Sequence, residues 1–353
     1  MTEISNNDSE ATHDPSRKNV ILLALSLALA MSGATMIMSV SALAGHMLAV
    51  DKSLATVPLA LQMAFVMATT VPASMLMRRI GRRAGFIVGQ GIGLTAGVIC
   101  VIAIHQGSFV LFTVGSALFG SHNAFWQYYR FAAADVAESN FKGKAISLVI
   151  SGGIVAAFTG PLLTNYTFDI NVIPFLGSFV TVAILAATAI LMLTLIDIPR
   201  PDIAERSSSG RPLTEIVRNP ELLAAIFVGM IGYSVMSLLM TATPLAMVAH
   251  GYMVHDASFV IQWHLIGMFA PAFFTGSLIV RFGVRKVMFS GTILLAGAII
   301  AALVGETVTH FWVALFALGL GWNFTFIGAS TLLTETYKPE ERAKVQALND
   351  FMV

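Results

Sequence analysis

The chain has 353 residues, of which 56% are hydrophobic and only 11% are charged. Soluble domains carry about 25% charged residues, so a water-soluble protein of this length would lack the charge to cover its surface. The composition therefore indicates a polytopic membrane protein, although the formal net charge is only +1.

Apolar runs about 20 to 28 residues long alternate with short charged segments. A helix of about 20 residues crosses about 30 Å of hydrocarbon. The runs show no sustained period-2 alternation, which favours helices over a transmembrane barrel. We predict an all-α fold with ten complete spans, at 20–44, 54–77, 84–104, 109–131, 145–164, 172–196, 221–248, 257–280, 287–305 and 311–334.

Polar segments divide this series into parts. Residues 1–19 have the composition of a polar tail, and 197–219 form the longest interior polar stretch, with Pro199, Pro201 and Pro212. Proline and serine clusters of this kind are typical of linkers. We expect a cytoplasmic tail at 1–19, a six-helix half at 20–196, a cytoplasmic linker at 197–219 and a second half at 220–353.

Positive charge is distributed very unevenly across the predicted membrane. Of the 20 Lys and Arg residues, only Lys52 falls on one side when the ten spans are threaded in order. Because cytoplasmic loops retain Lys and Arg, this distribution places both ends of the sequence in the cytoplasm. The expected location is the cell membrane, where the basic loops would contact anionic headgroups.

Signatures recur about 200 residues apart, which indicates duplicated halves. The segment 74–83 matches 276–285 at an offset of 202, and Asn123 and Asp135 match Asn323 and Glu335 at an offset of 200. Spans two to four therefore correspond to spans eight to ten. Transporters built from repeated halves hold their substrate near the midplane between the halves.

On these residues the chain resembles the major facilitator superfamily over essentially its whole length. The family signature G-x-L-x-D-R-x-G-R-R is matched at Gly81, Arg83, Gly276, Leu278, Arg281, Gly283 and Arg285. Ser74 replaces the first glycine, and Arg78 and Val280 stand at the acidic position that helps to latch the cytoplasmic gate in the family. The resemblance implies a fold of two pseudo-symmetric helical halves.

A substitute latch is predicted at the ends of spans four and ten. Asp135 would accept charge-assisted bonds from Arg82 or Arg83, and Glu335 from Arg285. The alternative is that these arginines only anchor the loops at lipid headgroups. The full set of candidate gating residues is Arg79, Gly81, Arg82, Arg83, Asp135, Arg281, Gly283, Arg285 and Glu335.

The family resemblance implies that helices one, four, seven and ten line the cavity. Span four carries a polar stripe at i, i+4 spacing. The candidate substrate-binding residues are His122, Asn123, Trp126, Gln127, Arg130, Tyr233, Ser237, Trp322 and Asn323. Three alternatives stay open: Arg130 could snorkel to the interface, the two Asn could bond neighbouring helices, and Trp126 could serve packing.

Ionisable groups are scarce in the predicted membrane interior. No Asp or Glu lies in the central part of any of the ten spans, which leaves His122 and His264 as candidate coupling residues. Histidine titrates near physiological pH. A hydrogen-bonded structural imidazole is the alternative for both, and uncoupled transport is a further one.

These groups suit a small, weakly charged, partly aromatic solute. The stretch from Phe125 to Asp135 and the double-arginine loop resemble a bacterial subgroup of the family with riboflavin uptake carriers. Gly160-Pro161 is similar to part of the antiporter signature, so efflux of drugs or metabolites is the rival function; a kink is the other interpretation of this proline.

Other classes of function are less well supported. No enzyme motif or metal-spaced Cys/His cluster occurs, so we expect no catalysis, no metal, no cofactor and no nucleic-acid partner. A non-transporting sensor stays an alternative, and a monomer is the default state. Val345 to Val353 resembles the opening of an eleventh helix. Against twelve helices in the family, helices 11 and 12 would be missing, so an inactive truncated product is a further alternative.

Overall fold

The computed structural model describes residues 15–138, 141–168, 170, 173–199 and 210–353. Within these ranges all regular structure is helical. The main helices are α1 (Pro15–Leu48), α2 (Val57–Ile80), α3 (Arg82–Gln106), α4 (Phe109–Trp126), α5 (Tyr129–Val136), α6 (Lys142–Thr167), α7 (Leu176–Thr194), α9 (Leu213–Ile216), α10 (Pro220–Ala249), α11 (Val254–Phe269), α12 (Ala272–Phe282), α13 (Val284–Val304), α14 (Val308–Thr334) and α15 (Arg342–Met352). Two short 3₁₀ helices, η1 (Lys52–Leu54) and η2 (Pro339–Glu341), lie in loops.

The predicted number of ten spans is not confirmed. Eight described helices are long and apolar enough to cross a membrane, or nine if the bent pair α11 and α12 forms one span. The expected span 109–131 is not among them, and it is divided between α4, which ends at Trp126, and the separate short helix α5. Most of the expected tail lies outside the described residues, and α1 already begins at Pro15.

The expected span 257–280 is bent by 41° between α11 and α12. Pro271 stands at the break, where its ring has no N–H to donate and crowds the preceding turn. Asn323 of α14 donates from Nδ2 to the carbonyl of Met268 at 2.6 Å. A neighbouring helix thus satisfies a carbonyl beside the bend, as a membrane interior requires.

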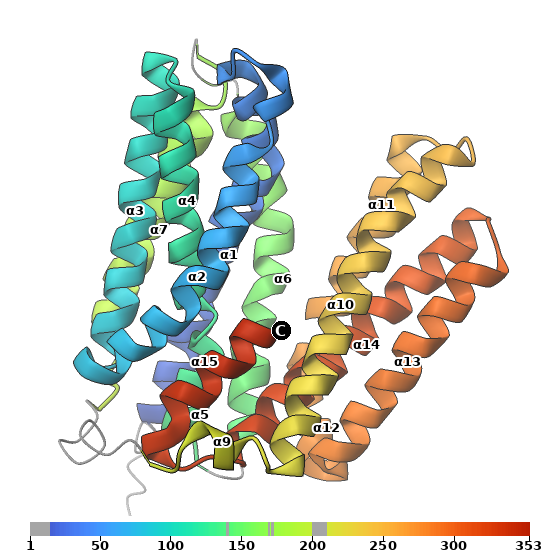
Figure 1. Ribbon diagram of the computed structural model, residues 1–353. Coiled ribbons are helices and arrows are strands. Elements are labelled where there is room, and N and C mark those ends of the chain that lie inside the picture. Colours follow the sequence, from blue (N-terminus) through green and yellow to red (C-terminus); the bar gives the residue numbers. More distant parts are fainter. Residues whose placement is uncertain (1–14, 139–140, 169, 171–172, 200–209) are drawn as a thin grey trace, which may run out of the picture.

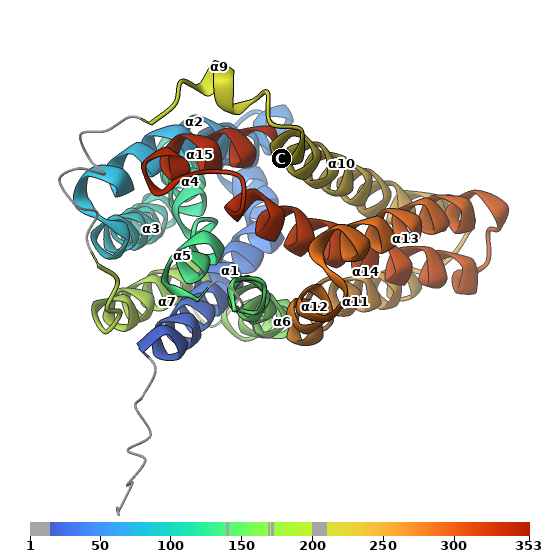
Figure 2. The same cartoon turned by 90° about the horizontal axis from the view of Figure 1, so that it is seen from below.

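The helices form two bundles (Figure 1). One contains α1 to α7 and the other α10 to α14, and the bundles diverge toward one end of the molecule. At the opposite end α6 packs against α12, and α15 packs against α2 of the first bundle. Figure 2 shows α15 lying beside α2 from below. We call the end where the bundles meet the basic end, because the loops with Arg78, Arg82 and Arg285 lie there.

Apolar packing joins the bundles at the basic end and along α6. One cluster there combines Phe86 and Tyr128 of the first bundle with Leu222, Leu333 and Val345 of the second half. Separate clusters fill the rest of each bundle, around Met36 and Phe179 in the first and around Leu315 and Leu318 in the second. The second cluster also takes in Ile146 and Ile150 of α6.

The internal repeat is visible in the backbone. Gly81 joins α2 to α3 and Gly283 joins α12 to α13, and both have φ of 89°. Side chains larger than hydrogen are strained at such a positive φ, which explains the glycine at this position of both motif copies. The shared backbone conformation makes the same tight turn in each half.

Gly160, which precedes Pro161 in α6, has a packing role. A Cβ at Gly160 would lie 2.7 Å from the Cβ of Thr35 in α1. The small residue therefore allows α1 and α6 to approach closely, as small residues do between membrane helices.

The described end of the linker is clamped to the second half at the basic end. Arg211 donates from Nε to Oε1 of Glu341 at 2.7 Å and from Nη2 to Oε2 at 2.8 Å, and the Glu341 side chain is fully buried. Hydrogen bonds from the Arg211 side chain lower the pKa of Glu341 to about 2, against an ordinary value of 4.5. The ionised carboxylate therefore holds the linker beside the start of α15.

We expect this clamp to lose its stabilising effect in acid. The folded state lowers the pKa of Glu341, so the contribution to stability is present above pH 4.5 and is lost as the pH falls toward 2. Replacing Glu341 with Gln should lower the melting temperature at neutral pH. It should also flatten the fall of that temperature from about pH 5 to about pH 3, measured by thermal unfolding in detergent. A variant with the parental acid dependence would contradict the clamp.

Candidate functional site

A central pocket lies between the two bundles. It offers room of about 150 Å³. Its walls come from α1, α4, α5 and α6 on one side and from α10, α11 and α14 on the other. The lining residues are Leu27, Met31, Trp126, Gln127, Arg130, Ile150, Tyr233, Met236, Met268, Phe269, Trp322 and Phe326. Five of the candidate substrate-binding residues meet here: Trp126, Gln127, Arg130, Tyr233 and Trp322.

Aromatic rings form the wall of the pocket contributed by the second bundle. Trp322 stacks on Phe326 of the same helix, with ring centroids 4.6 Å apart and planes 13° apart. Tyr233 and Phe269 approach Trp322 edge-on, at 6.3 Å and 6.0 Å. Stacked and edge-on arrangements are those that aromatic rings prefer. The wall is therefore a packed aromatic surface against which a planar apolar solute could lie.

Trp126 forms part of the opposite wall. Its Nε1 donates to Oδ1 of Asn123 at 3.1 Å, so Asn123 fixes the ring instead of lining the pocket. The indole is only partly buried. Trp126 thus keeps its polar edge bonded within α4 while it lines the pocket.

Arg130 is the cation of the pocket. Its Nη1 donates to the carbonyl of Gln127 at 2.9 Å, and its Nη2 is paired with Asp350 of α15. The guanidinium lies 4.4 Å from the ring centroid of Phe131 and 4.7 Å from that of Phe326. With a side chain only 6% exposed, Arg130 does not snorkel but connects the two halves.

The sequence analysis predicted no function for Asp350, because this residue follows the last predicted span. Its side chain is 1% exposed, so a buried carboxylate is present that the ten spans did not contain. A signal existed in the sequence: Arg342, Gln346 and Asp350 are spaced by four residues and share one face of a helix.

Other candidate residues lie away from the pocket. Asn323 is buried and accepts a hydrogen bond from Thr275 at 2.6 Å while it donates to Met268, so it joins α14 to α11 and α12. Ser237 is exposed on α10 and is not among the lining residues. Asn323 fits the alternative of bonding neighbouring helices, whereas Asn123 bonds Trp126 within its own helix.

The two candidate coupling histidines are each enclosed in their own bundle. Nδ1 of His122 lies 3.0 Å from the carbonyl oxygen of Gly89 in α3, and Nδ1 of His264 lies 2.8 Å from that of Leu315 in α14. Neither lines the central pocket. Both therefore match the structural alternative that the sequence left open.

The predicted bond between Arg82 and Asp135 is present at the basic end. Arg82 donates to Oδ2 of Asp135 from Nε at 3.2 Å and from Nη2 at 2.9 Å. The same oxygen is 3.2 Å from Nη1 of Arg342, which belongs to the second half. One carboxylate thus holds an arginine from each half.

The matching bond predicted between Glu335 and Arg285 is wrong. Arg285 pairs with Glu221 at the start of α10, within its own half. Arg285 is 75% exposed at the beginning of α13, where its long side chain reaches the nearer carboxylate. Among the described residues, the second copy of the motif therefore makes no ion pair between the halves.

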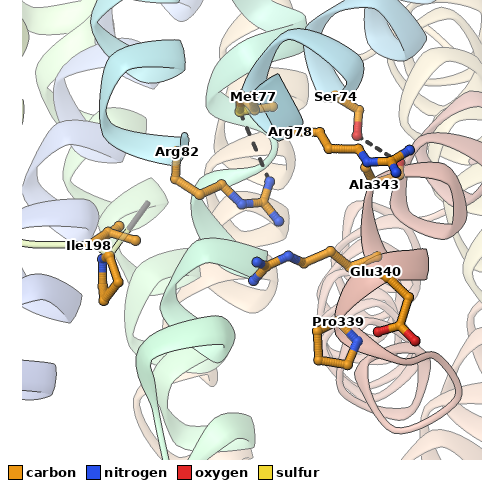
Figure 3. A pocket seen from close by; sticks show the side chains of 10 residues that line it. Ser74, Met77, Arg78, Arg82, Ile198, Pro339, Glu340 and Ala343 are labelled. Carbon is orange, nitrogen blue, oxygen red and sulfur yellow. Dashed lines mark hydrogen bonds between the residues drawn. The ribbon is translucent and has the colours of Figure 1, made fainter. Parts of the chain in front are cut away.

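The remaining gating candidates lie near these pairs. Arg83 donates to the carbonyl of Thr194, and Arg281 packs over the ring of Phe282 at 5.2 Å. Arg79 is exposed. Figure 3 shows the small basic-end pocket where α2 meets α15, with Ser74 donating to the carbonyl of Ala343 at 2.7 Å. Ser74, which replaces the motif glycine, therefore bonds across the two halves.

Two helical bundles that enclose an aromatic pocket and meet at one end define a secondary transporter working by alternating access. The profile of the Major Facilitator Superfamily matches residues 23–353. The chain belongs to this family and is a multi-pass bacterial membrane transporter of a small-molecule substrate.

Similar proteins agree with this family. The chain is 42% identical over 342 residues to the riboflavin transporter RfnT of Brucella anthropi, covering 96% of this chain and 85% of that protein. It is 30% identical over 293 residues to the uncharacterized MFS-type transporter YdeG of Bacillus subtilis, covering 78% and 67%.

Solved structures show the same fold. The Escherichia coli fucose:proton symporter FucP superposes with a TM-score of 0.74 at 16% identity, covering 96% of this chain and 88% of FucP. A bacterial homologue of the iron transporter ferroportin superposes with a TM-score of 0.73 at 11% identity, covering 95% and 88%.

Proposed function

We propose that the protein takes up riboflavin or a closely related aromatic solute. The observation that carries this proposal is the central pocket, which combines aromatic rings with one amide and one cation. A flavin has a flat ring system with carbonyl oxygens, so it can lie against rings and accept hydrogen bonds from Gln127 and Arg130. The riboflavin transporter that is 42% identical supports the same substrate.

The orientation follows from the distribution of charge. The basic end faces the cytoplasm, and the basic loops rest on anionic headgroups of the bacterial inner membrane. The bundles meet at that end, so the described conformation is closed to the cytoplasm. The transporter works as a monomer, because both walls of its pocket belong to one chain.

Opening and closing involve the loops between α2 and α3 and between α12 and α13. Gly81 and Gly283 provide the turns, and Arg82 with Asp135 provides the cytoplasmic latch. Arg79, Arg83 and Arg281 bind the protein or headgroups around these turns. Arg285 and Glu335 have no bond to each other that would support a matching latch in the second half.

Riboflavin uptake tests this function directly. Proteoliposomes with the purified chain, or bacterial cells that depend on external riboflavin and lack their own carrier, should accumulate radiolabelled riboflavin. Replacing Trp126 with Ala should raise the concentration for half-maximal uptake about tenfold, because a wall of the pocket is lost. Trp263 packs edge-on against Trp312 outside the pocket, so Trp263→Ala is the matched control with near-parental uptake.

Three other outcomes would contradict the proposal. Expulsion of hydrophobic drugs without riboflavin accumulation would indicate efflux. Riboflavin binding without accumulation would indicate a sensor. Equal losses in Trp126→Ala and Trp263→Ala would mean that the central pocket is not the binding site.

A further inference from the structure

The central pocket is small for the solute proposed to occupy it. It offers about 150 Å³, whereas sites that enclose drug-sized ligands usually have about 300–1,000 Å³. Riboflavin carries a chain of hydroxylated carbons on its ring system. The pocket can therefore hold the ring, while part of the solute extends beyond the pocket.

The chain of the solute has room at the end of the molecule where the bundles diverge. At the basic end Arg130 is paired with Asp350, and a shared apolar cluster joins the two bundles. Toward the other end the bundles move apart, and the outer parts of α6 and α11 are well separated (Figure 1). A solute that extends from the pocket in this direction passes along the outer parts of the pocket-lining helices.

Gln262 lies on the outward continuation of the pocket wall that α11 contributes. Helix α11 runs from Val254, far from the basic end, to Phe269, which lines the pocket. Gln262 precedes Phe269 by seven residues, which is almost two helical turns and about 10 Å along the axis. Both residues therefore lie on the same side of α11. The side chain of Gln262 is exposed.

The amide of Gln262 makes no hydrogen bond with any other residue that the structure describes. A glutamine in a membrane helix commonly bonds a neighbouring helix, and an amide without any hydrogen bond in apolar surroundings is costly. His264, two residues further on, bonds the carbonyl of Leu315 in α14. Residues two apart on a helix point to nearly opposite sides. The Gln262 amide is therefore directed away from α14, where water or solute can reach it.

The internal repeat indicates that the fold does not require this amide. At the offset of 202 found for the motif loops, Gln262 corresponds to Ala60 of α2. Ala60 is exposed as well, and α2 packs on α4 as α11 packs on α14. An apolar residue thus occupies the same structural position in the first half. The polar side chain on α11 has a role other than helix packing.

We propose that Gln262 binds the hydroxylated chain of the solute while the aromatic wall of the pocket holds its ring. An amide accepts from one hydroxyl through its oxygen and donates to another through its nitrogen, so it can bond two neighbouring hydroxyl groups. The substrate class is a planar ring system that carries a hydroxylated side chain. This inference rests on the proposed function, because it assigns a second subsite to the solute of the central pocket.

Lumiflavin separates the ring from the chain, because it has the riboflavin ring system with a methyl group in place of the hydroxylated chain. Binding of radiolabelled riboflavin to the full chain in lipid nanodiscs, and its displacement by unlabelled lumiflavin, give the two Kd values. In Gln262→Leu the Kd for riboflavin should rise about fivefold, because hydrogen bonds to the chain are lost. The Kd for lumiflavin should stay at the parental value.

Two further variants serve as controls. Gln106 is an exposed glutamine at the end of α3, which packs within the first bundle, so Gln106→Leu should leave both Kd values unchanged. Gln262→Asn keeps the amide on a shorter side chain and should recover part of the riboflavin affinity. An unchanged lumiflavin Kd also shows that the pocket of each variant is folded.

Each way in which the subsite can fail gives a distinct result. An unchanged riboflavin Kd in Gln262→Leu, or equal rises of both Kd values, would overturn the subsite. Either result leaves the proposed function intact if the parent accumulates riboflavin in proteoliposomes. A parent that binds neither riboflavin nor lumiflavin would reject the proposed function and the subsite together.

Discussion

Uptake by Asp135→Asn is expected to fall about tenfold or more, since breaking a buried charge pair is strongly destabilising. Asp135 is 11% exposed and binds Arg82 and Arg342, one from each half. The amide that replaces the carboxylate has no charge, so both guanidinium groups lose the negative charge of Asp135. The conformation closed at the basic end then becomes less populated. Because this is one of the two conformations between which the transporter alternates, transport slows.

The comparison variant is Glu335→Gln, which should transport at nearly the parental rate. Glu335 stands at the position equivalent to Asp135, but Arg285 pairs with Glu221. Initial rates of riboflavin uptake, normalised to the amount of folded protein in the membrane, measure both variants. Full activity in both would remove the latch role of Asp135.

Replacing Gly276 with Val is expected to lower uptake about as severely as Asp135→Asn does. The Cβ would lie 2.6 Å from Cα of Lys144 and 2.8 Å from the carbonyl oxygen of Gly143, both backbone atoms. Overpacking typically costs about 1–3 kcal/mol, and backbone cannot move aside as a side chain can. The strain falls on the contact between α6 and α12, where the halves meet.

Gly297→Val is the matched control for this substitution. Gly297 lies inside α13, and a Cβ there meets no atom within 4 Å. The same helix-interior change from glycine to valine should therefore leave uptake near the parental rate. Equal rates in both variants, from equal amounts of folded protein, would show that the close approach of α6 and α12 is not needed.

The predicted polar stripe of span four was only partly correct as a prediction of the pocket lining. The stripe from His122 to Arg130 follows helical spacing, yet only its later members line the pocket. Helix α4 ends at Trp126, and the amide of Tyr128 bonds to the carbonyl of Phe125, three residues back. His122 and Trp126 both belong to α4, yet the His122 ring bonds the carbonyl of Gly89 in α3 while Trp126 lines the pocket. The tighter turn then leads into α5, which carries Arg130.

The ion pairs show the same limit. The pairing of Arg82 with Asp135 was predicted correctly, whereas the equivalent pairing of Arg285 with Glu335 was wrong, although each pair lies within one repeat unit. Arg130 and Asp350 are 220 residues apart, and no local pattern relates them. Arg285 pairs with Glu221 and not with Glu335. Several carboxylates lie within reach of its exposed side chain, and only the packing of α10 and α13 decides which of them is nearer.

The sequence by itself determined that this protein is helical, lies in a membrane and has two related halves. Backbone groups in lipid must be bonded within their own segment, so long apolar runs have little choice but helix. Tertiary structure decided which polar residues share the pocket and which charges join the halves. Those contacts depend on helix breaks at Gln127 and Pro271 and on distances between helices, which no spacing along the chain records.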